Sequence, residues 1–79
     1  MEYSALAIDM KKTGQRIAQA MKEQGVTVRQ IQNVFGFEAP NAIYRWLRGS
    51  ALPTIDHLVI LAHTLEVCVD DLLVIRDEE

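Results

Sequence analysis

The chain has 79 residues and a formal net charge of −3, with 49% hydrophobic and 24% charged residues, four glycines and two prolines. This composition fits one small domain and excludes a disordered tail, a collagen-like fibre and a low-complexity linker. The longest unbroken apolar run, residues 58–62, is far shorter than the roughly 20 residues of a membrane-spanning helix. The single cysteine, Cys68, excludes an internal disulfide. We therefore expect a cytoplasmic single-domain protein that binds no cofactor, no metal and no membrane.

The charges are unevenly distributed along the chain. Residues 11–48 carry seven basic side chains against two acids, whereas residues 49–79 carry one basic side chain, Arg76, against seven acids. Such a division is typical of a protein with a basic working surface and an acidic remainder. The alternative is chance clustering of solvated surface charge.

The first predicted helix begins near residue 10 and is closed by Gly25. Its apolar and small residues recur at helical spacing and predict one buried stripe, formed by Met10, Gly14, Ile17, Ala18 and Met21. Glycine lowers helix propensity, so Gly14 indicates a close contact between helices. Residues 1–9 are expected to be an N-terminal extension, residues 10–75 the folded domain and residues 76–79 an acidic tail.

The second predicted helix has a clear start signal. Thr27 and Gln30 have the spacing of a capping box, in which each side chain accepts a hydrogen bond from the other residue's backbone N–H. Gly36 is placed to end this helix in a left-handed conformation. The residues expected to face the core are Ile31, Val34 and Phe35.

Three further helices follow. The third is predicted over residues 40–48, with Pro40 in its first turn and Gly49 after its end. A fourth begins after Thr54, and a short fifth covers residues 69–74. The core residues of these last two helices are expected to be Leu58, Leu61, Ala62, Leu65, Leu72 and Leu73. Because no segment shows sustained strand-like alternation, we predict an all-α fold of five helices.

The third helix has two distinct faces on a wheel of about 100° per residue. The expected packing face is formed by Ala39, Ile43, Trp46 and Leu47, and the outer face by Asn41, Tyr44, Arg45 and Arg48. Asparagine can bond bidentately to adenine and arginine to guanine, whereas a tyrosine or a terminal arginine suits sugar and phosphate. Together with the preceding helix and its glycine-containing turn, this face indicates a helix-turn-helix that binds duplex DNA. The alternative is an ordinary solvated helix.

An ordered series of features extends this pattern over about three quarters of the chain. It comprises a capped second helix, a glycine turn, Ile-x-x-Trp, Arg-Gly, Pro-Thr, a leucine-rich run and an Asp-rich helix. These features are carried by Thr27, Gly36, Ile43, Trp46, Arg48, Gly49, Pro53, Thr54, Leu58, Leu61, Ala62, Leu65, Val67 and residues 70–73. In this order they resemble the lambda-repressor-like, Cro/repressor-type (XRE) helix-turn-helix family. The resemblance implies a five-helix lambda-repressor-like bundle that binds DNA, usually as a dimer on a palindromic operator.

The sequence also departs from the family pattern. The stretch from Gly36 to Ile43 is one residue longer than usual, which would rotate or shift the recognition helix. Gln32 replaces a small residue, so the second and third helices are expected to pack less closely. Val28 replaces a glutamine that contacts phosphate, and Leu47 replaces an acid.

We therefore expect a transcriptional regulator of the repressor type, with residues 40–48 as the recognition helix in the major groove. Asn41 and Arg45 are the candidates for base edges. The candidates for phosphate contacts are Tyr44, Arg48, Ser50, Arg29 and the start of the second helix at Thr27. No nucleophile–base pair or convergent carboxylate set is recognisable, so no enzyme activity is expected.

A homodimer is also expected, with the chain ends in its interface. Apolar residues near both ends lie outside the core stripes, namely Tyr3, Leu6, Ile8, Val74 and Ile75. The alternative is that the two ends pack against each other within one chain. Two competing functions remain open: an antitoxin that binds DNA and a toxin protein, and a protein-interaction module that has lost DNA binding. Co-purification with a partner distinguishes the first, and absence of salt-dependent duplex binding the second.

Overall fold

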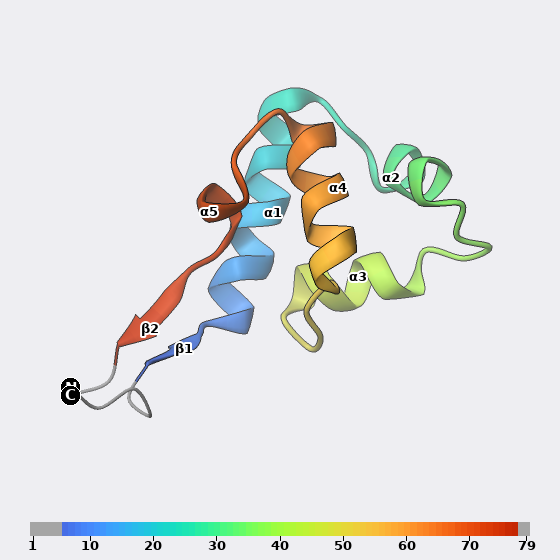
Figure 1. Cartoon of the computed structure of the whole chain (residues 1–79). Coiled ribbons are helices and arrows are strands. Elements are labelled where there is room, and N and C mark those ends of the chain that lie inside the picture. The colour runs from blue at the N-terminus through green and yellow to red at the C-terminus, as the bar shows by residue number, and fades with distance from the viewer. Residues whose placement is uncertain (1–5, 78–79) are drawn as a thin grey trace.

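The computed structural model describes residues 6–77, which form five helices and a pair of short strands, arranged as in Figure 1. The elements are β1 Leu6–Ile8, α1 Met10–Gln24, α2 Val28–Phe35, α3 Asn41–Arg48, α4 Ile55–Leu65, α5 Val69–Leu72 and β2 Ile75–Asp77. All five predicted helices are therefore confirmed. Helix α5 ends at Leu72 rather than at residue 74, because Leu73 already has extended backbone angles that lead into β2.

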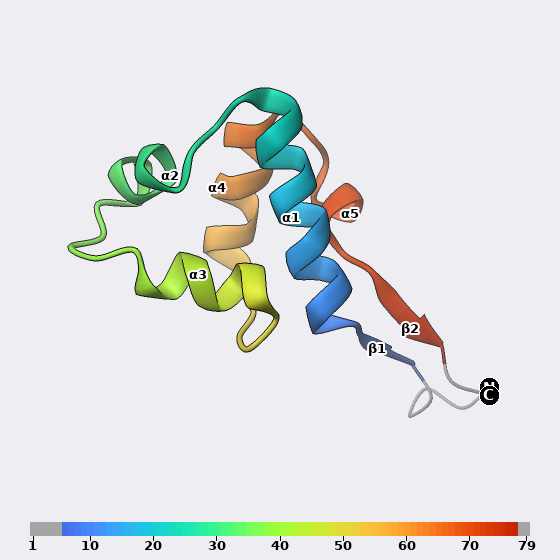
Figure 2. The same cartoon turned by 180° about the vertical axis from the view of Figure 1, so that it is seen from behind.

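Helices α1, α3 and α4 form the body of the molecule, and α2 lies at its side (Figure 1). Helices α1 and α4 lie side by side, α3 crosses one end of both, and α5 covers the far side of α1 (Figures 1 and 2). The largest fully buried side chains are Ile17, Ile31, Ile43, Leu61, Leu65, Leu72 and Thr13. No helix within residues 6–77 is both long and apolar enough to cross a membrane.

The local signals that begin and end the helices are confirmed. The Thr27 hydroxyl accepts from Gln30 N at 3.1 Å, and the Thr27 N–H donates to Gln30 Oε1 at 2.7 Å. Helix α2 then ends at Gly36, whose φ of 70° favours glycine. Thr54 caps α4 as predicted, whereas the Asp9 cap of α1 was not anticipated.

Three residues assigned to the core are exposed instead. Ala18 lies on the outer side of α1, which buries Thr13 and Ala20 in its place. Val34 is 55% exposed, because the outlying α2 is covered along one side only, where Ile31 is buried. Ala39 is exposed because it lies in the turn that precedes α3.

The two strands were not predicted, and they form an antiparallel sheet in the register Leu6↔Asp77, Ala7↔Arg76 and Ile8↔Ile75. The sheet is tied to α1, since Asp9 N donates to Val74 O at 2.7 Å and Val74 N donates to Thr13 Oγ1 at 3.0 Å. The described parts of the chain ends therefore meet within one chain, as the alternative interpretation held. Tyr3 lies outside the described residues.

Candidate nucleic-acid interface

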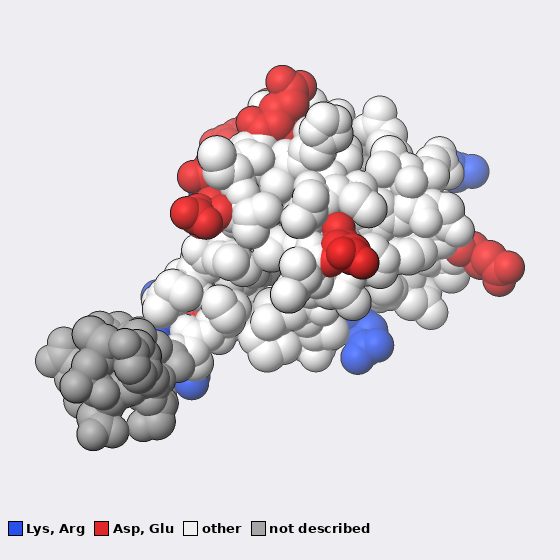
Figure 3. Space-filling model, viewed as in Figure 1, with Lys and Arg blue, Asp and Glu red and all other residues white. Residues whose placement is uncertain are grey.

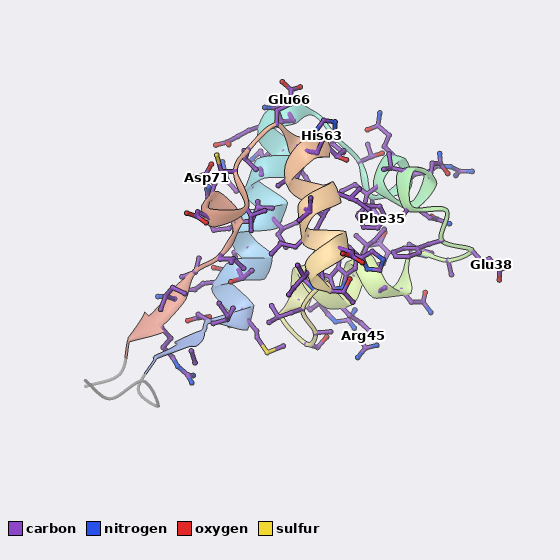
Figure 4. The ribbon with its side chains drawn as sticks, viewed as in Figure 1. Phe35, Glu38, Arg45, His63, Glu66 and Asp71 are labelled. Atoms are coloured by element: carbon purple, nitrogen blue, oxygen red, sulfur yellow. The ribbon has the colours of Figure 1, made fainter. Side chains whose placement is uncertain are left out.

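Helix α3 has the two faces that its sequence predicted, except that Ala39, which was assigned to the packing face, lies in the turn before the helix. Ile43 and Trp46 are 0% and 5% exposed on the inner side, and Leu47 is half-buried. Asn41, Tyr44, Arg45 and Arg48 are all exposed on the outer side. In Figure 4 the Arg45 side chain extends from α3 away from the other helices. The structure thus brings together four of the seven predicted contact residues on one uncovered helix face.

The C-terminal end of α3 is fixed against α1 by backbone contacts. A Cβ atom added to Gly14 would lie 2.6 Å from the Leu47 carbonyl oxygen and would also collide with that of Trp46. The close helix contact predicted at Gly14 is therefore confirmed. After α3, Gly49 has a φ of 80°, and a Cβ there would lie 2.6 Å from the Cα of Lys11. These contacts leave little freedom for the last turn of α3 to move relative to α1.

The inner face of α3 is supported through Trp46, which belongs to a cluster of four rings, Phe35, Phe37, Trp46 and His57. Phe35 stacks on His57 with the ring centroids 5.1 Å apart, and its ring lies edge-on to Phe37 at 5.2 Å. Trp46 lies within 5.7 Å of Phe35 and of His57. The cluster joins α2, the turn after it, α3 and α4, so it sets the angle between the two helices of the helix-turn-helix.

Gln32, one of the departures from the family pattern, has a structural role in this turn. Its Nε2 donates to the backbone oxygen of Phe37 at 3.3 Å, in a part-buried position. The side chain therefore links α2 to the segment that leads into α3. This bond explains how a larger residue is accommodated at that position.

The remaining predicted contact residues lie at the start of α2 (Thr27 and Arg29) and directly after α3 (Ser50), and all three are exposed. Arg29 projects from the first turn of α2. The Thr27 hydroxyl and N–H both serve the capping box, so this residue shapes the start of α2. Ser50 follows α3, and its hydroxyl donates to the Arg45 carbonyl oxygen at 3.3 Å. Thr27 and Ser50 thus have structural partners in addition to any role at the surface.

The basic segment of the sequence does not form a single basic face. Arg16 donates from Nε to the Asp71 backbone oxygen at 2.8 Å, on the α5 side of α1. Lys22 lies in the last turn of α1, far along the helix from α3. In Figure 3, acidic side chains lie over the α4 and α5 surface, and basic ones lie at the edges near α2, α3 and the strands. Glu38, labelled in Figure 4, places an acid in the turn before α3.

One exposed basic residue near α3 was missed by the sequence analysis. Lys11 belongs to the first turn of α1, and its backbone contacts Gly49 directly after α3. Gly14 was a signal for this proximity, because it predicted that α1 closely approaches another helix. It did not predict that this helix is α3.

Comparisons with known proteins agree with this architecture. The helix-turn-helix family profile matches residues 17–72, which is more than half of the chain. A crystal structure of the DNA-binding domain of BldD is similar, with 21% identity, a TM-score of 0.68, and coverage of 94% of this chain and 100% of that one. The S. venezulae BldD DNA-binding domain has 22% identity, a TM-score of 0.70, and coverage of 84% and 97% respectively. At these identities the structural likeness shows the fold alone. No curated protein matches the sequence.

The family profile and the geometry lead to the same assignment. The profile spans α2, the turn and α3, and it extends from the middle of α1 to the end of α5. The capping box of α2, the buried Ile43 and Trp46 and the glycine after α3 occupy the places at which the sequence resembled that family. The chain therefore belongs to the lambda-repressor-like, Cro/repressor-type (XRE) helix-turn-helix family.

Proposed function

We propose that the protein is a transcriptional regulator that binds duplex DNA with α3 in the major groove. The observation that carries this proposal is the outer face of α3, where exposed polar and basic side chains project from a helix whose inner face is buried. That face carries no acid, whereas an ordinary surface helix usually mixes charges of both signs. Residue types that read base edges and hold phosphates are therefore presented together on one rigid element.

The proposed contacts divide into two classes. Asn41 and Arg45 are assigned to base edges, because their side chains can bond bidentately to adenine and guanine. Tyr44, Arg48 and Ser50 are assigned to phosphates near the second half of α3. Arg29 and the start of α2 beside Thr27 are assigned to phosphates at the other side of the groove, where the helix dipole favours an anion.

Selection of bound sequences from a random duplex library tests the proposal and supplies the operator. On the selected sequence, we expect the logarithm of the affinity to fall with the logarithm of salt concentration with a slope near −4 to −5, as about four to six phosphate contacts per dimer require. Repressor action would then appear as reduced expression from a promoter that carries the selected site. No binding to any duplex at 50 mM salt would instead favour the protein-interaction module.

We further propose that the protein binds DNA as a homodimer, because one short recognition helix contacts too few bases for a unique genomic site. The strand pairing within one chain makes the chain ends weaker candidates for the dimer surface. Helix α4 is the better candidate, since it exposes Ile55, Val59 and Ile60 at 79%, 53% and 40% and carries one charged residue, Asp56. A helix that is apolar all round is normally covered on all sides.

Sedimentation at micromolar concentration tests this interface on Val59→Asp, with Ile75→Asp as the matched chain-end variant. A dimeric parent, a monomeric Val59→Asp and a dimeric Ile75→Asp would support α4 as the interface. The reverse pattern would return the interface to the chain ends. A parent that is monomeric alone but purifies with a second protein would favour the antitoxin, with the apolar face of α4 covered by the toxin.

A further inference from the structure

We propose that Lys11, at the start of α1, binds a DNA phosphate beside the C-terminal end of α3. This inference rests on the proposed DNA binding and adds a contact from a helix outside the helix-turn-helix. The first support is proximity: a Cβ atom on Gly49 would lie 2.6 Å from the Cα of Lys11 and 2.9 Å from its backbone nitrogen. Lys11 is therefore a spatial neighbour of the residue that ends α3.

The second support is the side of α1 from which Lys11 projects. At about 100° per residue, Lys11 lies about 60° around the helix from Gly14, whereas Lys12 lies about 160° from it. Gly14 packs against the last turn of α3, so Lys11 is on the α3 side. Lys12 is on the opposite side, where it lines a shallow depression with Arg16, Gln19 and Val74.

The third support is the length of α3 compared with the groove it would occupy. Its eight residues span about 12 Å at 1.5 Å per residue, close to the 12 Å width of the major groove. A cation just beyond the end of such a helix therefore meets the sugar–phosphate backbone rather than a base edge. Lys11 is exposed beside Gly49, and Arg48, which directly precedes Gly49 in the chain, is exposed as well. The nearby acid Asp9 accepts a hydrogen bond from the backbone nitrogen of Lys12 at 2.9 Å, as the cap of α1.

A purely structural role for Lys11 makes a different prediction. The last carbonyl groups of α3 carry partial negative charge, so an ammonium group beside them would stabilise the folded chain without touching DNA. Loss of that interaction would lower the melting temperature but leave the salt dependence of DNA binding unchanged. Measurement of both quantities on the same variants therefore separates the two roles.

The experiment compares Lys11→Gln with its sequence neighbour Lys12→Gln, using the full chain, the selected duplex and an unrelated duplex. Each substitution removes one positive charge, so the overall charge of the protein changes equally. We expect Lys11→Gln to weaken binding to both duplexes about two- to fivefold at 100 mM salt, as one exposed ion pair would. We also expect it to reduce the steepness of the salt dependence by about 0.9 per bound protomer. Lys12→Gln should match the parent, and Lys11→Arg should restore the parent slope.

Several results would overturn the proposal. Equal slopes for Lys11→Gln, Lys12→Gln and the parent would show that Lys11 does not contact phosphate. A loss confined to the selected duplex would instead assign Lys11 to a base edge. If the parent itself showed no salt-dependent binding to duplex DNA, the proposed function would fail and this contact with it. If the parent binds duplex DNA with the expected salt dependence and Lys11→Gln has the same affinity and slope, the Lys11 contact is refuted but the proposed DNA binding is not.

Discussion

The two ends of α3 are held in different ways. The C-terminal end lies on α1 through backbone atoms, because Gly14 and Gly49 allow the backbones of the two helices to approach closely. The N-terminal end begins at Pro40 without a side-chain cap, and the turn before it is held by side chains: the rings of Phe35 and Phe37, which contact Trp46, and the bond from Gln32 to Phe37. Backbone contacts at van der Waals distance permit little adjustment, whereas side chains can repack. The comparison teaches that α3 has a fixed C-terminal end and an adaptable N-terminal end, where the turn before the helix can change by side-chain repacking.

The largest effect is expected from Gly14→Ala, at the fixed end. The added methyl group would meet the carbonyl oxygens of Trp46 and Leu47, and neither backbone can move away without shifting a whole helix. We expect the free energy of unfolding to fall by about 3 kcal/mol in urea denaturation followed by Trp46 fluorescence. The control is Gly36→Ala, which meets no atom within 4 Å and should cost only the strain of its positive φ, about 1 kcal/mol. Equal losses for the two variants would show that the fixed end is not tightly packed.

The next largest effect is expected in DNA binding, where substitutions of Asn41 and Arg45 test the first and the second half of α3 separately. Arg45→Ala should weaken binding to the preferred duplex by about 2 kcal/mol and flatten the sequence preference, as for a lost bidentate base contact. Asn41→Ala should cost about 1 kcal/mol, the lower end of the range for a bidentate base contact, because Asn41 is the first residue of the adaptable end. Arg48→Ala is the control for a phosphate contact and should weaken all sequences alike. A larger loss for Asn41→Ala than for Arg45→Ala would contradict this ranking.

A smaller effect is expected from Phe37→Ala at the adaptable end. Its ring contacts Phe35, Trp46 and His57 but is only half-buried. Since a fully buried ring costs 3–5 kcal/mol to remove, we expect a loss of about 1.5 kcal/mol in the free energy of unfolding. Val34→Ala, on the exposed side of α2, should cost less than about 0.5 kcal/mol. The prediction fails if calorimetry gives both variants the melting temperature of the parent.

The smallest effect is expected from Gln32→Ala. The variant removes the 3.3 Å bond from Gln32 Nε2 to the Phe37 carbonyl oxygen and should cost about 0.5–1 kcal/mol in the same denaturation assay. Because the bond holds the turn before α3, amide hydrogen exchange should quicken in residues 36–39 but not in α1. Gln15→Ala, on the exposed surface of α1, provides the control. Unchanged exchange in the turn would show that the rings alone hold this end.

The features that sequence predicted well depend on neighbouring residues. The capping box of Thr27 and Gln30 and the glycines after α1, α2 and α3 act within one helical turn, so the sequence contains both partners. The outer face of α3 was predicted for the same reason, since one helical period separates its two faces. Whether that face contacts DNA as proposed depends on an absent partner and stays a prediction.

The features that sequence missed depend on contacts between distant segments. Strands β1 and β2 have three residues each, too few to show alternation, and their partners lie at opposite ends of the chain. The ring cluster brings His57 of α4 against Phe35 at the end of α2 and Phe37 in the turn after it, and no local spacing in the sequence predicts this contact. The place of Lys11 next to Gly49 likewise follows from how α1 crosses α3.

The pairing of β1 with β2 has a consequence for the order of folding. Leu6 and Asp77 are register partners, so the sheet closes almost the whole chain into one loop, whereas α2 and α3 meet across a short turn. Contacts between distant residues carry a loop-closure entropy cost and form slowly. We therefore expect the sheet to form after the helices and to be the first element to open in native-state hydrogen exchange. Because the sheet lies at the far end of α1 from α2, this opening would leave the capping box and the ring cluster intact.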